Sequence, residues 1–171
     1  MTYNIHPIFV HFPIALLFVY SIIKIIPFKK WFSTIAWKHI EIVLLVTGVL
    51  GAFVASATGE IAEELTNQSH QLVEMHATFA AAATWMYGLL LAGELLALIT
   101  PIVAQKYAIP KIVGISMWVQ RILLDPVVSA VLAIGGLIAI SITGLLGGVM
   151  VYGTTADPVA GIVLQLLGIT L

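Results

Sequence analysis

The fold of this chain is decided by its first apolar stretch, residues 6–27, which reads HPIFVHFPIALLFVYSIIKIIP. Apart from two histidines near its start and Lys24 near its end, this stretch carries no ionisable side chain except a tyrosine. A helix needs about 20 mostly apolar residues to cross the hydrocarbon core of a bilayer. The stretch is long enough for that, and we therefore expect a membrane-spanning helix here.

The rest of the chain repeats this pattern three times. Of the 171 residues, 61% are hydrophobic and only 9% are charged, whereas about 25% of the residues of a soluble domain are charged. We therefore predict an all-α integral membrane protein, a single domain over residues 1–171 that forms an up-down four-helix transmembrane bundle. The expected spans are about residues 7–27, 40–59, 71–99 and 126–152.

Proline positions indicate where two of these helices begin and end. Thr100-Pro101 is expected to end the third helix, because proline lacks the backbone N–H that the next turn needs. Asp125-Pro126 is typical of the start of the fourth, with an N-cap acid followed by a proline in the first turn.

Two shorter segments fall outside the four spans. Residues 108–124 are short and carry two cations, which favours a cytoplasmic interfacial segment. Residues 158–171 are apolar but too few to cross the bilayer, so we expect a short re-entrant or docked C-terminal helix.

All seven Lys and Arg residues fall in two of the connections. Lys24, Lys29, Lys30 and Lys38 follow the first span, and Lys106, Lys111 and Arg121 follow the third. Loops rich in Lys and Arg stay on the cytoplasmic side of a membrane. Since the N-terminus, the 2–3 loop and the C-terminal segment carry none, both termini are predicted to be extracytoplasmic.

Four of the five histidines lie toward the opposite, cation-free side. His11 lies about one turn into the first helix, and His76 follows His70 by six residues, about 9 Å along the third. Both helices start from the same side, so these two imidazoles are expected at similar depth. Ionisable groups within spans are costly and tend to be functional. We therefore predict that His11 and His76 bind a cofactor or metal, with an interfacial role as the alternative.

Further residues near this pair extend the predicted site. His6 and His70 are candidates for additional ligands or for bonds to haem propionates, although an interfacial role near the boundary is the favoured explanation for both. Glu74, four residues after His70, is placed to orient that ring. Gly147 and Gly148 leave room for a flat cofactor between helices, or alternatively for close helix contact.

Glu94 is the acid most deeply placed in the third span. It is interpreted as a proton or ion relay, or as a snorkelling side chain or the partner of a cation such as Arg121.

The residue types narrow the chemistry of the site. With no cysteine, the chain has no thiolate ligand for a metal, an iron–sulfur cluster or a covalently attached haem. The leading hypothesis is a membrane-embedded b-type cytochrome-like electron-transfer protein or redox-complex subunit, with haem b between helices 1 and 3 on the extracytoplasmic side. Alternatives are a copper or zinc protein or transporter that uses several His with Glu60 or Glu74, and a non-catalytic anchor subunit. No catalytic set stands out, and whether the chain is an enzyme stays open.

The opening string HPIFVHFPIAL at residues 6–16 resembles the HP-x-x-VHFPIAL signature of a family of uncharacterised prokaryotic membrane proteins, a domain of unknown function. The resemblance extends to residues 57–60, to His76 and to residues 143–152. It implies a location in the prokaryotic cytoplasmic membrane. Because some relatives are joined to Rieske-type domains, it also implies a redox context, with a Rieske-type protein, a c-type cytochrome or a quinone as partner. A homo-oligomer fits as well, whereas nothing in the chain suggests a nucleic acid partner.

The predicted orientation can be tested with single cysteines in this cysteine-free chain. We expect a membrane-impermeant thiol reagent added to intact cells to label cysteines at Asn67 and Asp157 and to spare those at Lys29 and Lys106, because positive loops stay inside. The reverse labelling pattern would invert the topology.

Overall fold

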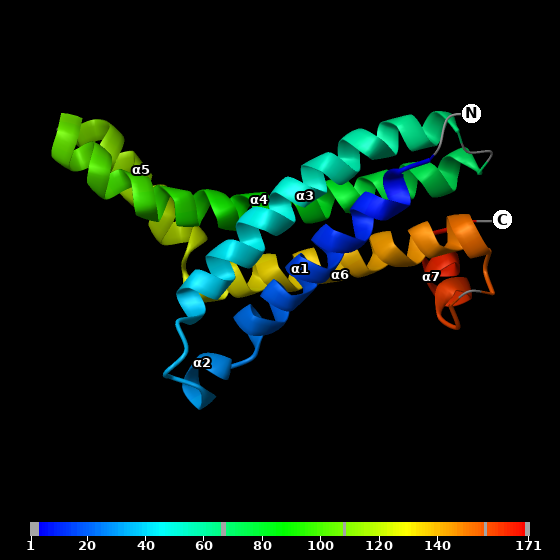
Figure 1. Ribbon diagram of the computed structural model, residues 1–171, viewed down its shortest axis with the longest axis horizontal. Helices are drawn as coiled ribbons and strands as arrows, with labels where there is room; N and C mark the ends of the chain where they lie inside the picture. The colour runs from blue at the N-terminus through cyan, green and yellow to red at the C-terminus, as the bar shows by residue number, and fades with distance from the viewer. Residues whose placement is uncertain (1–3, 66–67, 108, 156, 170–171) are drawn as a thin grey trace.

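The computed structural model describes residues 4–65, 68–107, 109–155 and 157–169 (Figure 1). Within these ranges the chain is helical and contains no strand, which confirms the all-α class. The helices are α1 (His6–Ile25), α2 (Phe28–Trp31), α3 (Trp37–Glu64), α4 (His70–Tyr107), α5 (Pro110–Leu123), α6 (Pro126–Tyr152) and α7 (Ala160–Leu166).

Four helices, α1, α3, α4 and α6, are long and apolar enough to cross a membrane, as the sequence predicts. Figure 1 shows that α1 runs beside α3 and that α4 runs beside α6, with the two pairs crossing at an angle. Contacts of α1 with α6 and of α3 with α4 close the bundle. The chain enters α1 and α4 at the same end of this bundle, and it leaves α3 and α6 there.

The two ends of the bundle differ in their ionisable residues. We call the end where α1 and α4 begin the histidine end, because His6, His70 and His76 lie there. We call the opposite end, around α2 and the start of α3, the lysine end, because Lys24, Lys29 and Lys38 lie there. The N-terminus and the C-terminus both lie at the histidine end (Figure 1).

The centre of the bundle combines large apolar residues with glycines. Tyr87 of α4 is fully buried, and a Cβ atom built at Gly136 of α6 would lie 2.8 Å from its ring. A Cβ at Gly48 of α3 would lie 2.5 Å from Leu17 of α1. These glycines therefore serve close helix packing, which is one of the two roles that the sequence suggests for small residues in these spans.

A buried hydrogen-bonded cluster ties α1 to α4 and α6. Ser21 Oγ lies 2.8 Å from the hydroxyl of Tyr87 and donates to the carbonyl of Ala133 at 3.2 Å. Because the single Ser21 hydroxyl proton is used for Ala133, the Tyr87 hydroxyl donates to Ser21. Hydrogen bonds of this kind satisfy polar groups where no water is present.

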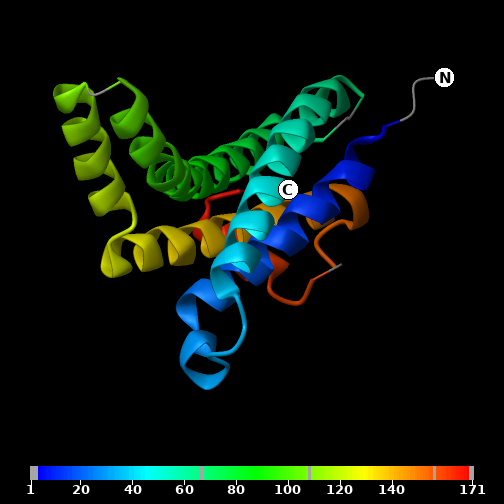
Figure 2. The same ribbon diagram turned by 60° about the vertical axis from the view of Figure 1, so that its left-hand side comes forward.

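The third span ends later than the sequence predicts. Helix α4 continues through Pro101 to Tyr107, so the expected stop at Thr100-Pro101 is wrong. A proline removes only one hydrogen bond of the helix, and α5 packs back along α4, where a Cβ at Gly93 would lie 3.0 Å from Leu123. At about 1.5 Å per residue, the 38 residues of α4 are about 57 Å long. Its last turns and α5 extend from the bundle as a helical hairpin (Figure 2).

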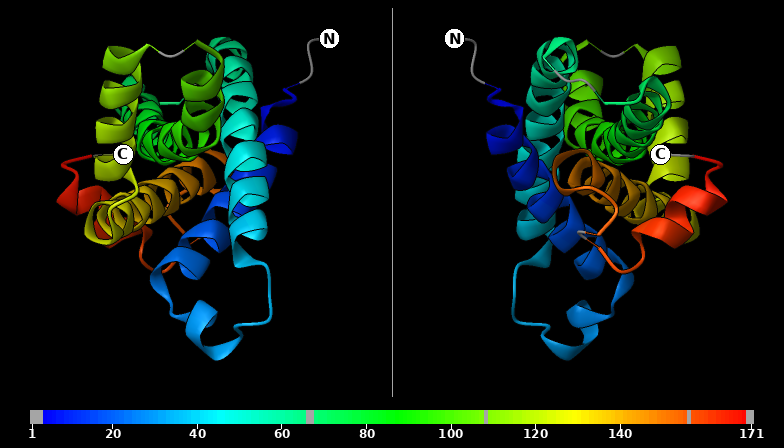
Figure 3. Two further views of the ribbon diagram at one scale, coloured as in Figure 1. Left: turned by 90° about the vertical axis from the view of Figure 1, so that its left-hand side faces the viewer. Right: turned by 90° about the vertical axis from the view of Figure 1, so that its right-hand side faces the viewer.

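The C-terminal segment docks on the histidine end. Helix α7 lies against α6, as both views of Figure 3 show, with Leu164 packed among Leu72 of α4 and Leu146 of α6. Gln71 donates a side-chain hydrogen bond to the carbonyl of Gly168 at 3.0 Å. The expected short C-terminal helix is therefore present and packs on the bundle.

The close packing of Gly136 against Tyr87 predicts the outcome of a substitution. Gly136→Ala should lower the thermal unfolding temperature in detergent, because overpacking a tight core costs about 1–3 kcal/mol and a better helix propensity returns only about 1 kcal/mol. Gly144→Ala in the same helix is the matched control, since nothing lies within 4 Å of its Cβ position. If Gly136→Ala lowers the unfolding temperature no more than Gly144→Ala does, this account is wrong.

Candidate functional site

Two of the five histidines lie side by side at the histidine end. His6 is the first residue of α1, and His76 lies in the second turn of α4. Their ring centroids are 6.5 Å apart and their planes are almost perpendicular, at 81°. Both residues are partly buried. The helical start at His6 follows from Pro7, which favours a first turn because its missing N–H has no partner there in any case.

His76 is held by α6. Its Nδ1 lies 3.0 Å from the backbone carbonyl of Thr143. A carbonyl only accepts hydrogen bonds, so Nδ1 donates and carries the proton. The ring packs beside Gly147 of α6, where a Cβ atom would lie 3.4 Å from Cε1 of His76, at van der Waals contact. The lone pair of His76 is therefore on Nε2.

His6 is held in the same way by α3. Its Nδ1 lies 3.1 Å from Oγ1 of Thr58. The Thr58 hydroxyl donates its own proton to the carbonyl of Ala55 at 2.9 Å, so it accepts from Nδ1 of His6. Gly59 of α3 lies beside the ring, with its Cβ position 3.3 Å from His6. The two rings therefore share one tautomer, with a proton on Nδ1 and a lone pair on Nε2.

His11 does not lie in this pair. Its side chain is exposed, and its Nδ1 lies 2.6 Å from the carbonyl of Pro7 one turn earlier. Five residues separate His6 from His11, which at about 100° per residue turns the second ring about 140° around the helix. The predicted depth of His11 along α1 agrees with the histidine end, but its side chain does not point toward His76. The ring beside His76 is that of His6.

The remaining predicted residues are spread over the histidine end. His70 and Glu74 are both exposed, with Nδ1 and a carboxylate oxygen 3.6 Å apart, as expected for a Glu four residues after a His. They line an open groove of about 420 Å³, together with Glu63 and Ala77. Glu60 is exposed. Gly148 faces open space, unlike Gly147. Across the described ranges, no three His, Asp or Glu side chains are placed to hold one metal ion.

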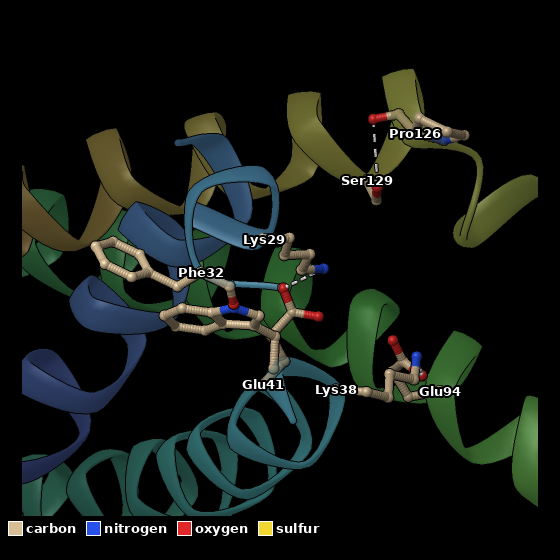
Figure 4. Close-up of polar contacts among 8 residues, drawn as sticks. Lys29, Phe32, Lys38, Glu41, Glu94, Pro126 and Ser129 are labelled. Carbon is tan, nitrogen blue, oxygen red and sulfur yellow. Dashed lines mark hydrogen bonds and ion pairs between the residues drawn. The ribbon is translucent and has the colours of Figure 1, made fainter. Parts of the chain in front are cut away.

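The lysine end holds a second set of ionisable residues. Glu41 of α3 pairs with Lys29 of α2 at 2.7 Å, and Glu94 of α4 pairs with Lys38 of α3 (Figure 4). Both carboxylates are buried. Arg121, the partner that the sequence suggests for Glu94, is exposed on α5. Glu41 is not among the site residues predicted from the sequence, although its position inside an apolar span is a signal of the same kind as that of Glu94.

Comparison with known proteins identifies the family of the chain. No curated protein and no solved structure matches it. The sequence matches one protein family, described as predicted membrane protein (DUF2231), over residues 2–157, a range that includes both ion pairs and the histidine pair with its threonine and glycine supports. The match confirms the resemblance that the N-terminal string suggests, and the chain belongs to this family of predicted membrane proteins.

Proposed function

We propose that this protein is a membrane-embedded b-type cytochrome-like electron-transfer protein in which His6 and His76 are the axial ligands of a haem. The observation that carries the proposal is the shared tautomer of the two adjacent imidazoles. In each ring Nδ1 is used for a hydrogen bond to the protein. The hydrogen bond on one ring nitrogen decides which nitrogen binds a metal. Both Nε2 atoms therefore carry the lone pair that a metal ligand needs.

The spacing of the rings is compatible with ligation to one metal. Imidazole–metal bonds of about 2.0 Å place the two coordinating nitrogens about 4 Å apart. The ring centroids are 6.5 Å apart, a separation close to that of two imidazoles on opposite sides of one metal ion.

The number of ligands favours haem over a free ion. Zinc sites take three or four ligands from the protein, and the described residues bring two imidazoles together without a third ligand. A haem carries four nitrogens of its own and needs two axial ligands at most. The copper or zinc alternative with Glu60 or Glu74 is therefore less well supported.

The protein groups around the pair have separate tasks in this proposal. Haem iron supplies one-electron exchange. Thr58 and the carbonyl of Thr143 hold the two Nδ1 protons and fix the ring directions. Gly59 and Gly147 lie in contact with the two rings. The four helices that carry or support the pair are apolar and long enough to span a membrane, which supports a site at the extracytoplasmic end of the spans.

The wider setting of the site is part of the proposal. The location is the prokaryotic cytoplasmic membrane, with the histidine end and both termini extracytoplasmic, because the lysine end carries the positive loops. The electron partner is a Rieske-type protein, a c-type cytochrome or a quinone, and the protein works alone or as a homo-oligomer.

Absorption spectra of the purified protein before and after dithionite test the site. We expect a Soret band with α and β bands on reduction. His76→Ala and His6→Ala should each abolish these bands or convert the iron to a high-spin form, because each removes one axial ligand. His11→Ala should leave the spectrum unchanged, since its ring is exposed and bonded within its own helix.

Thr58→Val is a second test, which leaves both proposed ligand residues unchanged. It removes the acceptor for Nδ1 of His6 and should weaken haem binding by about 10–100-fold, as losses of such supporting partners do. A protein without Soret absorption when expressed with haem available would refute the haem proposal. Loss of the spectrum in His11→Ala with retention in His6→Ala would restore the pairing of His11 with His76.

A further inference from the structure

The hairpin of α4 and α5 leaves the bundle at the lysine end and changes direction there. Residues 95–107 of α4 form its outgoing arm, about 20 Å long at 1.5 Å per residue, and α5 returns along this arm to Leu123, beside Gly93. The left view of Figure 3 shows the central part of α4 nearly end-on, whereas α5 and the last turns of α4 are seen from the side. The hairpin therefore turns away from the direction of its span.

The two faces of α5 differ in their exposure. Ser116 and Gln120 lie on one face and are partly buried, in a helix that packs chiefly on α4. Ile115, Trp118 and Ile122 follow one another by three and four residues on the other face, and all three are exposed, Trp118 to 65%. We call these three residues the outward strip. No described residue covers this strip of bulky apolar side chains.

Three cations lie on the same hairpin without an acid near them in the sequence. Lys106 near the end of α4 and Lys111 and Arg121 of α5 are exposed, and we call them the hairpin cations. The chain has no Asp or Glu between Glu94 and Asp125. None of the hairpin cations forms an ion pair with a residue in the described ranges. The hairpin therefore carries three positive charges that the protein itself does not balance.

Two of the hairpin cations are neighbours of the outward strip. Residues three and four positions apart are adjacent on a helix surface. Lys111 lies four residues before Ile115, and Arg121 lies three residues after Trp118. Positive charge and bulky apolar side chains are thus mixed on one exposed face of α5.

A membrane surface accommodates such a mixed face better than water does. At the boundary of a bilayer, aliphatic side chains enter the acyl region and a Trp ring lies at the level of the headgroups. Lys and Arg run their apolar stems along the same surface and place their charged ends among the phosphates. The four spans already hold the chain in a bilayer, so the headgroups at the lysine end are within reach of the hairpin.

We propose that the α4–α5 hairpin is a binding surface for anionic phospholipids in the leaflet at the lysine end. The outward strip enters the boundary of the acyl chains, and the hairpin cations bind the headgroups. A zwitterionic headgroup brings its own ammonium group to the site, whereas an anionic headgroup does not. Because no acid accompanies the hairpin cations, the anionic headgroup is preferred. This surface is at the opposite end of the bundle from the histidine pair, so the proposal is independent of haem.

The lipid beside the hairpin can be identified with single cysteines in this cysteine-free chain. The full chain with Ile115→Cys carries a thiol-reactive fluorophore in vesicles of equal parts phosphatidylcholine and phosphatidylglycerol. Bromine near the top of the acyl chains of one lipid quenches a fluorophore that contacts that lipid. We expect brominated phosphatidylglycerol to quench several-fold more than brominated phosphatidylcholine, and high salt to reduce the difference, because salt screens exposed charges.

A second label position and two sets of substitutions provide the controls. A label at Ile138→Cys, an exposed position in the middle of α6, should be quenched to the same extent by the two lipids. Replacing all three hairpin cations with Gln should make quenching of the label at position 115 equal for the two lipids. Lys30→Gln removes an exposed lysine of α2 at the same end, outside both ion pairs, and should leave the preference unchanged.

Circular dichroism and gel filtration confirm that each variant is folded. If the triple variant does not fold, the three single substitutions replace it, and each should lower the preference for phosphatidylglycerol. Equal quenching by the two lipids with all hairpin cations present would overturn the proposal. An absence of quenching by either lipid would overturn it too, and would indicate water or a soluble partner around the hairpin. A preference that falls as much in Lys30→Gln as in the triple variant would assign it to the whole lysine end and contradict a site on the hairpin.

Discussion

The hydrocarbon core of a membrane offers no water, so every polar group inside the bundle needs a partner from the protein itself. The structure meets this constraint in three ways. Ser21 and Tyr87 share hydroxyl protons with each other and with a carbonyl. Glu41 and Glu94 meet lysines that reach in from the surface. The two paired histidines donate to groups of α3 and α6. Each of these three interactions joins different helices, so the polar groups also help to determine which helices are neighbours.

Glycines lie beside the rings that form these interhelical contacts. Gly147 lies next to the His76 ring that bonds the Thr143 carbonyl. Gly59 lies next to the His6 ring that bonds Thr58. In the middle of the bundle Gly136 lets the ring of Tyr87 pack against α6. From the sequence, small residues in the spans are expected either to allow helix contact or to leave room for a cofactor. In the structure, Gly59, Gly136 and Gly147 are in contact with aromatic rings of the protein itself.

Composition and charge distribution were enough to predict the helical class and the four spans, because burial in lipid demands long apolar helices. The direction in which a side chain points around its helix axis was harder to predict. Depth along α1 was predicted for His11, but its direction follows from about 100° per residue and from which face of α1 meets α3 and α4. The partner of Glu94 lies on α3, and its identity depends on how α3 crosses α4. Helix α4 continues through Pro101, and α5 packs back along α4, a tertiary arrangement that the local sequence does not predict.

Buried ionisable groups are paired with lysines at one end of the bundle and bonded as rings at the other. The difference in side-chain length explains this. A lysine has a four-carbon stem, so its ammonium can stay half in water while it contacts a buried carboxylate. An imidazole has one carbon between backbone and ring and has no comparable reach. At the histidine end, which has no lysine or arginine, a partly buried ring is accommodated more easily as a neutral group with one N–H bonded to the protein. A neutral imidazole has one donor and one lone pair. The hydrogen bond that satisfies the donor therefore also leaves the other ring nitrogen with its lone pair, and burial gives both rings of the pair the same tautomer.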